Sequence, residues 1–144
     1  MPFLELENYR SRYPKLSELI SRLQVYLDRE LERTFEQLKN PSLPLHDIRP
    51  EHLSIKLSID EGLSLTLLMI AEDAGLVERS YKIYCPDTDN FLGEFPSIES
   101  IPVTVRCPYH EFGEIDHDTN ECLLDVVFHF TEQVLGMRTH AIAV

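Results

Sequence analysis

The fold is decided by the stretch Ala74-Gly75-Leu76-Val77-Glu78-Arg79-Ser80-Tyr81-Lys82-Ile83-Tyr84-Cys85-Pro86, where the pattern of apolar residues changes from helical to extended. Before this stretch, apolar residues at helical spacing predict a compact helix that ends at Ala74-Gly75: Leu63, Leu65, Leu67, Leu68, Ile70 and Ala71. Gly75 suits the left-handed position that follows many helices, where Leu76 can fold back on the last turn. Alternation around Tyr81 and Ile83 then predicts a strand over residues 77–84.

Three further extended segments follow this strand. Turn-forming residues come next, in the sequence Cys85-Pro86-Asp87-Thr88-Asp89-Asn90. They lead into a short segment around Phe91, Leu92 and Phe95. Residues 103–107 alternate again and lead into Cys107-Pro108-Tyr109-His110. Residues 122–130 place four apolar side chains on one face: Leu124, Val126, Phe128 and Phe130. The C-terminal part of the domain is therefore predicted to be a small antiparallel sheet.

The first 40 residues are predicted to form a helical arm, and residues 41–144 a second domain. Residues 1–12 have no clear period and are expected to be irregular. From residue 13 apolar residues recur every three or four positions up to Asn40-Pro41: Leu16, Leu19, Ile20, Leu23, Leu27, Leu31, Phe35 and Leu38. This stripe has two interpretations, packing on the following domain or forming a homodimer or partner helix. The partner-facing candidates are Leu23, Tyr26, Leu27, Leu31 and Phe35.

Residues 49–59 fit either a strand or a helix. Leu53, Ile55 and Leu57 alternate with polar residues, yet Asp47 and Pro50 make a good helix start. We favour a short helix, because a turn at Asp60-Glu61-Gly62 and a second helix come next. Two short helices, a turn and a strand are the parts of a winged helix. The predicted class is α+β, with an N-terminal amphipathic helix, winged-helix-like helices and a sheet of ribbon-like hairpins.

Charge and cysteine content restrict the classes of function. The formal net charge is −12, and residues 40–144 supply all of it with six Lys/Arg against eighteen Asp/Glu. Such an acidic surface repels a phosphate backbone, so direct nucleic-acid binding is not expected. Three cysteines are an odd number, and the sequence has neither a secretory signal nor a long apolar run. These features predict a soluble protein of the reducing cytoplasm, without a membrane partner.

The run from Ala74 to Pro86, followed after a spacer by Val105-Arg106-Cys107-Pro108-Tyr109-His110, resembles the winged-helix plus zinc-ribbon-like modules found in bacterial conflict and defence proteins. The resemblance covers about residues 49–130. It implies an adaptor or regulatory subunit that binds a protein partner in a bacterial system such as antiviral defence or signalling. It implies such a module more than an enzyme.

The predicted metal site departs from a full zinc ribbon. Cys85 has Thr88 where a ribbon has its second cysteine, and Cys107 is followed by His110. These three residues, Cys85, Cys107 and His110, suit a structural zinc, which needs a fourth ligand. The candidates for that position are Asp87, Asp89, His117 and Cys122. The alternative is a metal-free ribbon in which the cysteines are small buried apolar residues.

Three functions remain in different classes. The leading one is the non-catalytic adaptor, with Phe91, Leu92 and Phe95 as a second partner-facing group on a presented loop. The second is an acidic inhibitor or nucleic-acid mimic that occupies a basic groove. The third is a zinc- or thiol-dependent enzyme built on Cys85 or Cys107 with His110, but the sequence has no complete catalytic motif and no catalytic residue is assigned. The acidic residues 116–121 are expected to form a solvated loop, since they lack the glycine and glutamate of a calcium loop.

Overall fold

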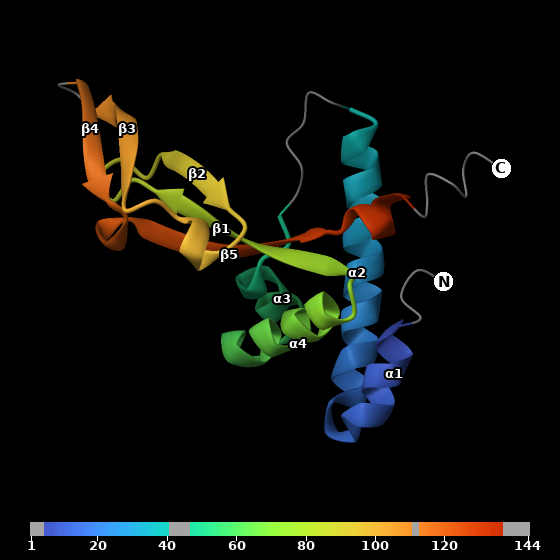
Figure 1. Cartoon of the computed structure of the whole chain (residues 1–144). Coiled ribbons are helices and arrows are strands. Elements are labelled where there is room, and N and C mark those ends of the chain that lie inside the picture. The colour runs from blue at the N-terminus through green and yellow to red at the C-terminus, as the bar shows by residue number, and fades with distance from the viewer. Residues whose placement is uncertain (1–4, 41–46, 111–112, 137–144) are drawn as a thin grey trace. The chain divides into compact units, whose positions relative to one another are not determined.

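The computed structural model describes residues 5–40, 47–110 and 113–136, and its helices and strands confirm the predicted α+β class (Figure 1). The chain forms two compact units: a helical unit of residues 1–78 and 128–144, and a ribbon unit of residues 79–127. The two short helices thus share a unit with the long N-terminal helix, so the expected boundary between residues 40 and 41 is not the one that separates the units. Within the described ranges, every helix is too short or too polar to cross a membrane.

The described part of the helical unit includes the helices α1 (Glu5–Arg12), α2 (Ser17–Leu38), α3 (Pro50–Leu57) and α4 (Glu61–Asp73), and residues 132–136 are also helical. Figure 1 shows α1 alongside the first turns of α2, which it contacts. The expectation that residues 1–12 are irregular is wrong for α1. Leu6 is fully buried, and the Tyr9 hydroxyl donates a hydrogen bond to the carboxylate of Asp73 at the end of α4. Docking against α2 and α4 therefore stabilises a helix whose own periodicity is weak.

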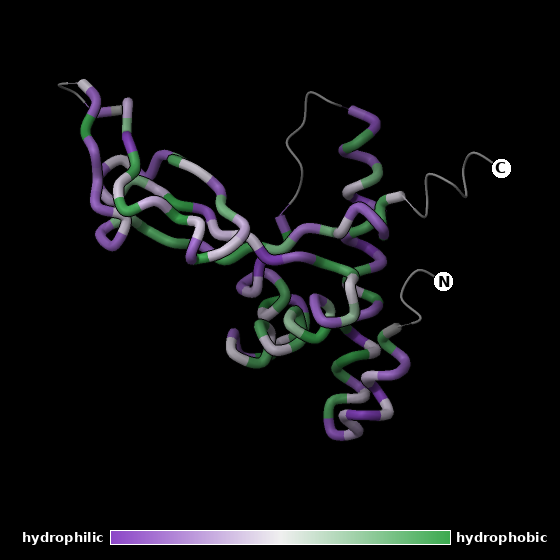
Figure 2. Tube along the Cα trace, viewed as in Figure 1, coloured by the Kyte–Doolittle hydropathy of each residue, from purple (hydrophilic) through white to green (hydrophobic). Residues whose placement is uncertain are grey.

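The apolar stripe of α2 supplies the core of the helical unit. Apolar and polar residues alternate in bands along this helix (Figure 2). Leu23 and Leu27 are fully buried, Leu31 and Tyr26 are 4% and 6% exposed, and Phe35 is half-buried. Burying one leucine contributes roughly 1.5–3 kcal/mol to folding. The stripe thus packs inside the unit, which is the first of the two interpretations, and four of its five partner-facing candidates are core residues.

Local signals in the sequence define the ends of α3 and α4. Pro50 is the first residue of α3, where its missing N–H is not needed, and Ser58 ends the helix in a left-handed conformation with φ of 56°. The carboxylate of Asp60 accepts a hydrogen bond of 2.7 Å from the Leu63 N–H and caps α4. The buried Ser64 hydroxyl donates to the Pro50 carbonyl at 2.6 Å and joins the two helices. The predicted helix over the ambiguous residues 49–59 is confirmed.

Gly75 ends α4 as the sequence predicts. Its φ is +79°, and its N–H donates to the Glu72 carbonyl at 3.0 Å. The Leu76 N–H donates to the Ala71 carbonyl, also at 3.0 Å, and the Leu76 side chain is buried. This pair of hydrogen bonds is a Schellman motif, in which a residue with positive φ satisfies the last carbonyls of a helix. The chain then enters the first strand directly.

Replacing Gly75 with alanine is expected to lower the free energy of unfolding by about 1–2 kcal/mol, because a Cβ is unfavourable at positive φ. No atom lies within 4 Å of the Cβ position, so steric overlap contributes nothing. Gly136→Ala is the control: its Cβ also meets nothing within 4 Å, and its φ is not positive. Urea unfolding measures both variants. Equal losses in the two variants contradict the backbone explanation.

The ribbon unit is built from five strands, two of which, β1 and β5, also extend into the helical unit: β1 (Val77–Tyr84), β2 (Phe91–Phe95), β3 (Thr104–His110), β4 (Gly113–Asp118) and β5 (Leu123–Phe130). They form a three-stranded sheet in the order β2-β1-β5 and a separate antiparallel hairpin of β3 and β4. Strand β2 pairs antiparallel with β1. The sequence predicts four of these strands but not β4. The loop expected over residues 116–121 is wrong for Asp116–Asp118, which pair with β3.

Candidate metal centre

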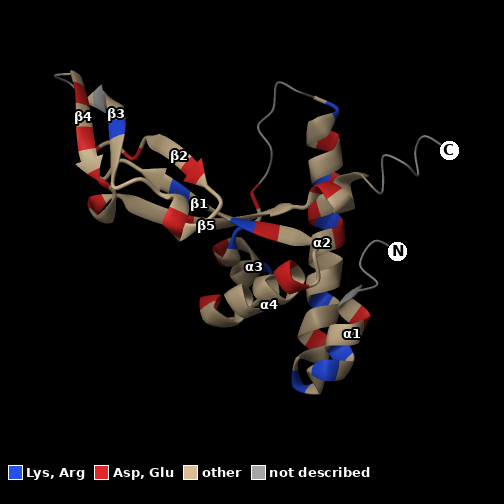
Figure 3. Cartoon of the chain, viewed as in Figure 1, with Lys and Arg blue, Asp and Glu red and all other residues tan. Residues whose placement is uncertain are grey.

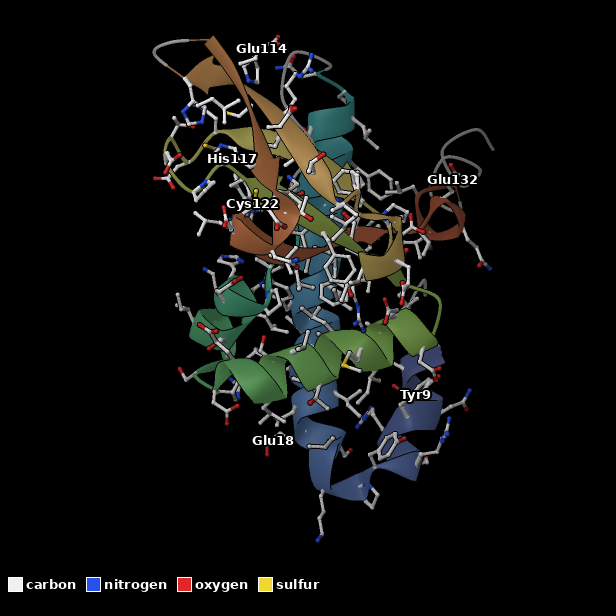
Figure 4. The ribbon with its side chains drawn as sticks, turned by 60° about the vertical axis from the view of Figure 1, so that its left-hand side comes forward. Tyr9, Glu18, Glu114, His117, Cys122 and Glu132 are labelled. Atoms are coloured by element: carbon white, nitrogen blue, oxygen red, sulfur yellow. The ribbon has the colours of Figure 1, made fainter. Side chains whose placement is uncertain are left out.

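Four side chains of the ribbon unit converge between the turn after β1 and the β3–β4 hairpin. Cys85 follows β1, Cys107 and His110 lie on β3, and His117, labelled in Figure 4, lies on β4. One ligand atom from each lies within 4.8 Å of all the others. The Cys85 Sγ is 3.4 Å from the Nε2 of both His110 and His117, and the two Nε2 atoms are 2.9 Å apart. These four residues are close enough to hold one metal ion.

The spacing of these atoms fits a tetrahedral ion. Bonds of about 2.0–2.1 Å to nitrogen and about 2.3 Å to sulfur place neighbouring ligand atoms roughly 3.3–3.8 Å apart. The two sulfur–nitrogen distances of 3.4 Å lie within this range, and the nitrogen–nitrogen distance of 2.9 Å is shorter by about 0.4 Å. A small outward shift of one imidazole therefore brings Cys85, His110 and His117 to tetrahedral spacing, and the Cys107 ligand atom lies within 4.8 Å of these three.

The turn after β1 prepares Cys85 as a thiolate. The Cys85 N–H donates to the Asn90 carbonyl and the Asp89 N–H donates to the Cys85 carbonyl, both at 2.9 Å, which closes the turn around the sulfur. Burial by itself raises the pKa of this thiol. Hydrogen bonds from the Thr88 hydroxyl, from the backbone N–H groups of Asp87 and Thr88 and from Cys107 outweigh burial and lower the pKa to about 6. At pH 7 Cys85 is mostly in the form that binds metal.

Thr88 occupies the position at which a full zinc ribbon has its second cysteine. In this chain its hydroxyl hydrogen-bonds to the Cys85 sulfur. Oriented donors around a thiolate stabilise its charge before a metal arrives, as they do around other anions. The first turn therefore supplies one ligand and its supporting donors, and the hairpin supplies the other three ligands.

The register of the β3–β4 hairpin brings the remaining ligands to one face. Val105 pairs with His117, and Cys107 lies two residues from Val105, so Cys107 and His117 share a face. His110 lies three positions after Cys107, which in a regular strand places it on the opposite face. The register shifts between these two residues, and this irregularity turns His110 back toward Cys107.

Burial separates this cluster from ordinary surface side chains. Cys85 and Cys107 are fully buried, His117 is 8% exposed, and the His110 side chain is 12% exposed. Imidazole and thiol groups buried without water need partners, and here each has the others. The Asp87 carboxylate lies 3.9 Å from His110 Nε2, at the solvent side of the cluster.

The structure selects His117 from the four candidates for the fourth ligand. The described part of the chain holds no other cluster of this kind, and neither Asp89 nor Cys122 belongs to it. The Cys122 thiol donates instead to the Asp118 carbonyl at 3.6 Å. Burial first, and then the nearby charges of Cys85, Glu121, Asp118 and Cys107, raise the pKa of Cys122. It therefore remains a thiol outside the ligand set.

The second predicted partner-facing group lies on β2. Phe91 is 50% exposed, and its ring contacts Tyr84 edge-on and the Lys82 ammonium at 5.7 Å. Leu92 and Phe95 are half-buried. Phe91 is thus the most accessible of the three.

The fold and cluster together define an α+β protein with a candidate Cys2His2 metal centre in its ribbon unit. Comparison with protein-family models, with curated proteins and with solved structures gives no significant match. Its function is therefore argued from the site.

Proposed function

We propose that this protein is a non-catalytic adaptor or regulatory subunit whose ribbon unit is held together by one structural zinc ion. The observation that carries the zinc proposal is the convergence of Cys85, Cys107, His110 and His117 within 4.8 Å. Two thiolates and two imidazoles suit zinc and are a common set for structural zinc. Catalytic zinc sites usually have three protein ligands and a position open to water.

The topology supports a structural role for the ion. Residues 79–127 bury few large side chains, and their largest fully buried one is Ile83. The core of so small a unit supplies little stability, and small proteins add disulfides, a structural metal or an oligomer contact. All three cysteines are free thiols, so no disulfide supplies this stability. Zinc joins the turn after β1 to the β3–β4 hairpin in place of a larger core.

The adaptor part of the proposal is supported by the closed ligand set and by the resemblance to winged-helix plus zinc-ribbon-like modules of bacterial defence proteins. A metal with four protein ligands leaves no coordination position for a substrate. Phe91 on the β2 edge offers an aromatic contact of the kind enriched at protein interfaces. A ribbon unit that presents such a surface acts by binding a protein partner.

Cobalt substitution tests whether the site is closed. Co²⁺ added to the metal-free full-length protein is expected to give the strong visible bands of a tetrahedral ion and a thiolate charge-transfer band at one equivalent. Azide or cyanide should leave the spectrum unchanged, because no position is open. Cys122→Ser is the matched control and should give the same spectrum. A weak octahedral spectrum, or bands that shift with azide, contradicts the structural site.

A further inference from the structure

A hollow of about 590 Å³ in the helical unit is lined by α2 and the last turn of α3. The residues of α2 that face it recur at helical spacing from Glu18, which lies at the start of α2 in Figure 4, to Arg33. Its apolar surface comes from Val25, Tyr26 and Leu57. Tyr26 and Leu57 are buried, whereas Val25 is 52% exposed. We call this hollow the α2–α3 groove.

Cations dominate the rim of the groove. Arg22, Arg29, Arg33 and Lys56 are all exposed and face two carboxylates, Glu18 and Glu30. Four positive and two negative charges leave the groove at +2, in a chain of net charge −12. Basic residues recur along α2 in Figure 3. The groove therefore has the opposite charge to the chain as a whole.

The four cations of the groove differ in whether other residues of the chain already pair with them. Arg33 lies 3.7 Å from the Glu30 carboxylate, which is buried. Arg22 donates a hydrogen bond of 2.8 Å to the Leu57 carbonyl. Arg29 and Lys56 make no ion pair with any residue in the described ranges. These two cations, one on each wall, remain available to a ligand.

Polar contacts fix the floor of the groove. The Tyr26 hydroxyl is 2.8 Å from His52 Nδ1, which ties α2 to α3. Burial, followed by the charge of Glu30, raises the pKa of Tyr26, so this phenol is neutral at physiological pH. A floor that is held in place in this way does not need to be ordered by a ligand, which favours binding.

We propose that the α2–α3 groove binds an acidic segment of a partner protein that carries one large apolar side chain between carboxylates. The apolar side chain lies on Val25 and Leu57, and the carboxylates pair with Arg29 and Lys56. This inference rests on the proposed adaptor function and names the chemistry of its partner.

Nucleic acid fits the groove less well. Its phosphates would meet Glu18 and Glu30 inside the groove, and the chain as a whole carries a net charge of −12. Binding to phosphate also makes no use of the exposed Val25. An acidic peptide places its apolar side chain there, which removes that side chain from water.

The test is a selection of random displayed peptides on the wild-type protein, with removal of peptides that also bind the double variant Arg29→Glu/Lys56→Glu. Enriched peptides are expected to carry Asp or Glu on both sides of a leucine or an aromatic residue. Enrichment of basic or uncharged peptides, or no enrichment, overturns the proposal.

The affinity of an enriched peptide is then measured by fluorescence anisotropy. Arg29→Glu and Lys56→Glu should each weaken binding at least about tenfold, and rising salt should weaken it too. The control Lys15→Glu makes the same change of charge at an exposed residue outside the groove and should change affinity by less than about twofold.

Two further measurements separate the alternatives. A labelled single-stranded oligonucleotide that binds the wild type and is lost in Arg29→Glu overturns the peptide assignment, as does a homodimer that dissociates in that variant. Zinc content is determined for each variant, because the groove and the metal cluster lie in different units. A variant that loses peptide binding but retains zinc tests the groove alone. A protein without zinc contradicts the proposed structural metal site alone.

Discussion

Replacing Cys85 with serine is expected to lower zinc affinity by more than about 100-fold, since even the outer partners of metal ligands contribute 10–100-fold. The serine hydroxyl stays protonated at neutral pH and is a poor replacement for a thiolate. Binding of structural zinc supplies roughly 10–16 kcal/mol in small zinc domains. The ribbon unit should therefore lose its fold, which is visible as collapse of the amide dispersion of residues 79–127 in NMR spectra.

Cys122→Ser is the matched control for this experiment. It makes the same chemical change a few residues from His117, at a thiol outside the cluster (Figure 4). It should retain one zinc per chain by elemental analysis and keep the amide dispersion of the ribbon unit. Equal zinc loss in both variants, or full zinc content in Cys85→Ser, contradicts the proposed ligand set.

Truncating Leu27 to alanine is expected to lower the free energy of unfolding of the helical unit by about 2–5 kcal/mol. Leu27 is fully buried, so the change removes buried methyl groups and leaves a cavity. Urea denaturation followed by circular dichroism measures the change. This variant tests whether the α2 stripe forms a core or a partner surface.

Val25→Ala provides the comparison two residues away on the same helix. Val25 is 52% exposed, and its truncation should change stability by less than about 0.5 kcal/mol. A loss below about 1 kcal/mol in Leu27→Ala is much smaller than a buried leucine requires, and would show that Leu27 is not part of a packed core.

The sequence predicts the junction between helix and strand well because the signals there are local. A glycine is the residue best suited to the φ of +79° at Gly75, and the alternation from Val77 to Tyr84 matches β1 at both ends. Prediction fails where tertiary contacts decide. Helix α1 depends on the burial of Leu6, and β4 has the mostly polar sequence Gly113–Asp118 with only Ile115 as a large apolar residue.

The candidate metal site could be predicted in part. Cys85, Cys107 and His110 follow from the two Cys-Pro motifs of the sequence, because such motifs are local. His117 remains one of four candidates in the sequence, since only the pairing of Val105 with His117 brings it to the same face as Cys107. The register shift that reorients His110 also cannot be predicted from the periodicity of the sequence, because it depends on how the two strands pair.

The partner-facing candidates on α2 show a different limit. A stripe of leucines every three or four residues has the same appearance whether it packs on its own unit or on another chain. Burial of Leu23 and Leu27 decides between the two, and burial depends on where α3 and α4 lie. The basic groove on the same helix also depends on Lys56 and Leu57 of α3, which the sequence does not connect with α2.

Zinc-edge X-ray absorption of the protein, purified without added metal or chelator, shows whether Cys85, Cys107, His110 and His117 hold zinc. We expect one zinc per chain with two sulfur atoms at about 2.3 Å and two imidazole nitrogens at about 2.0–2.1 Å. A protein without zinc, a coordination sphere of oxygen atoms, or a third sulfur contributed by Cys122 would contradict it.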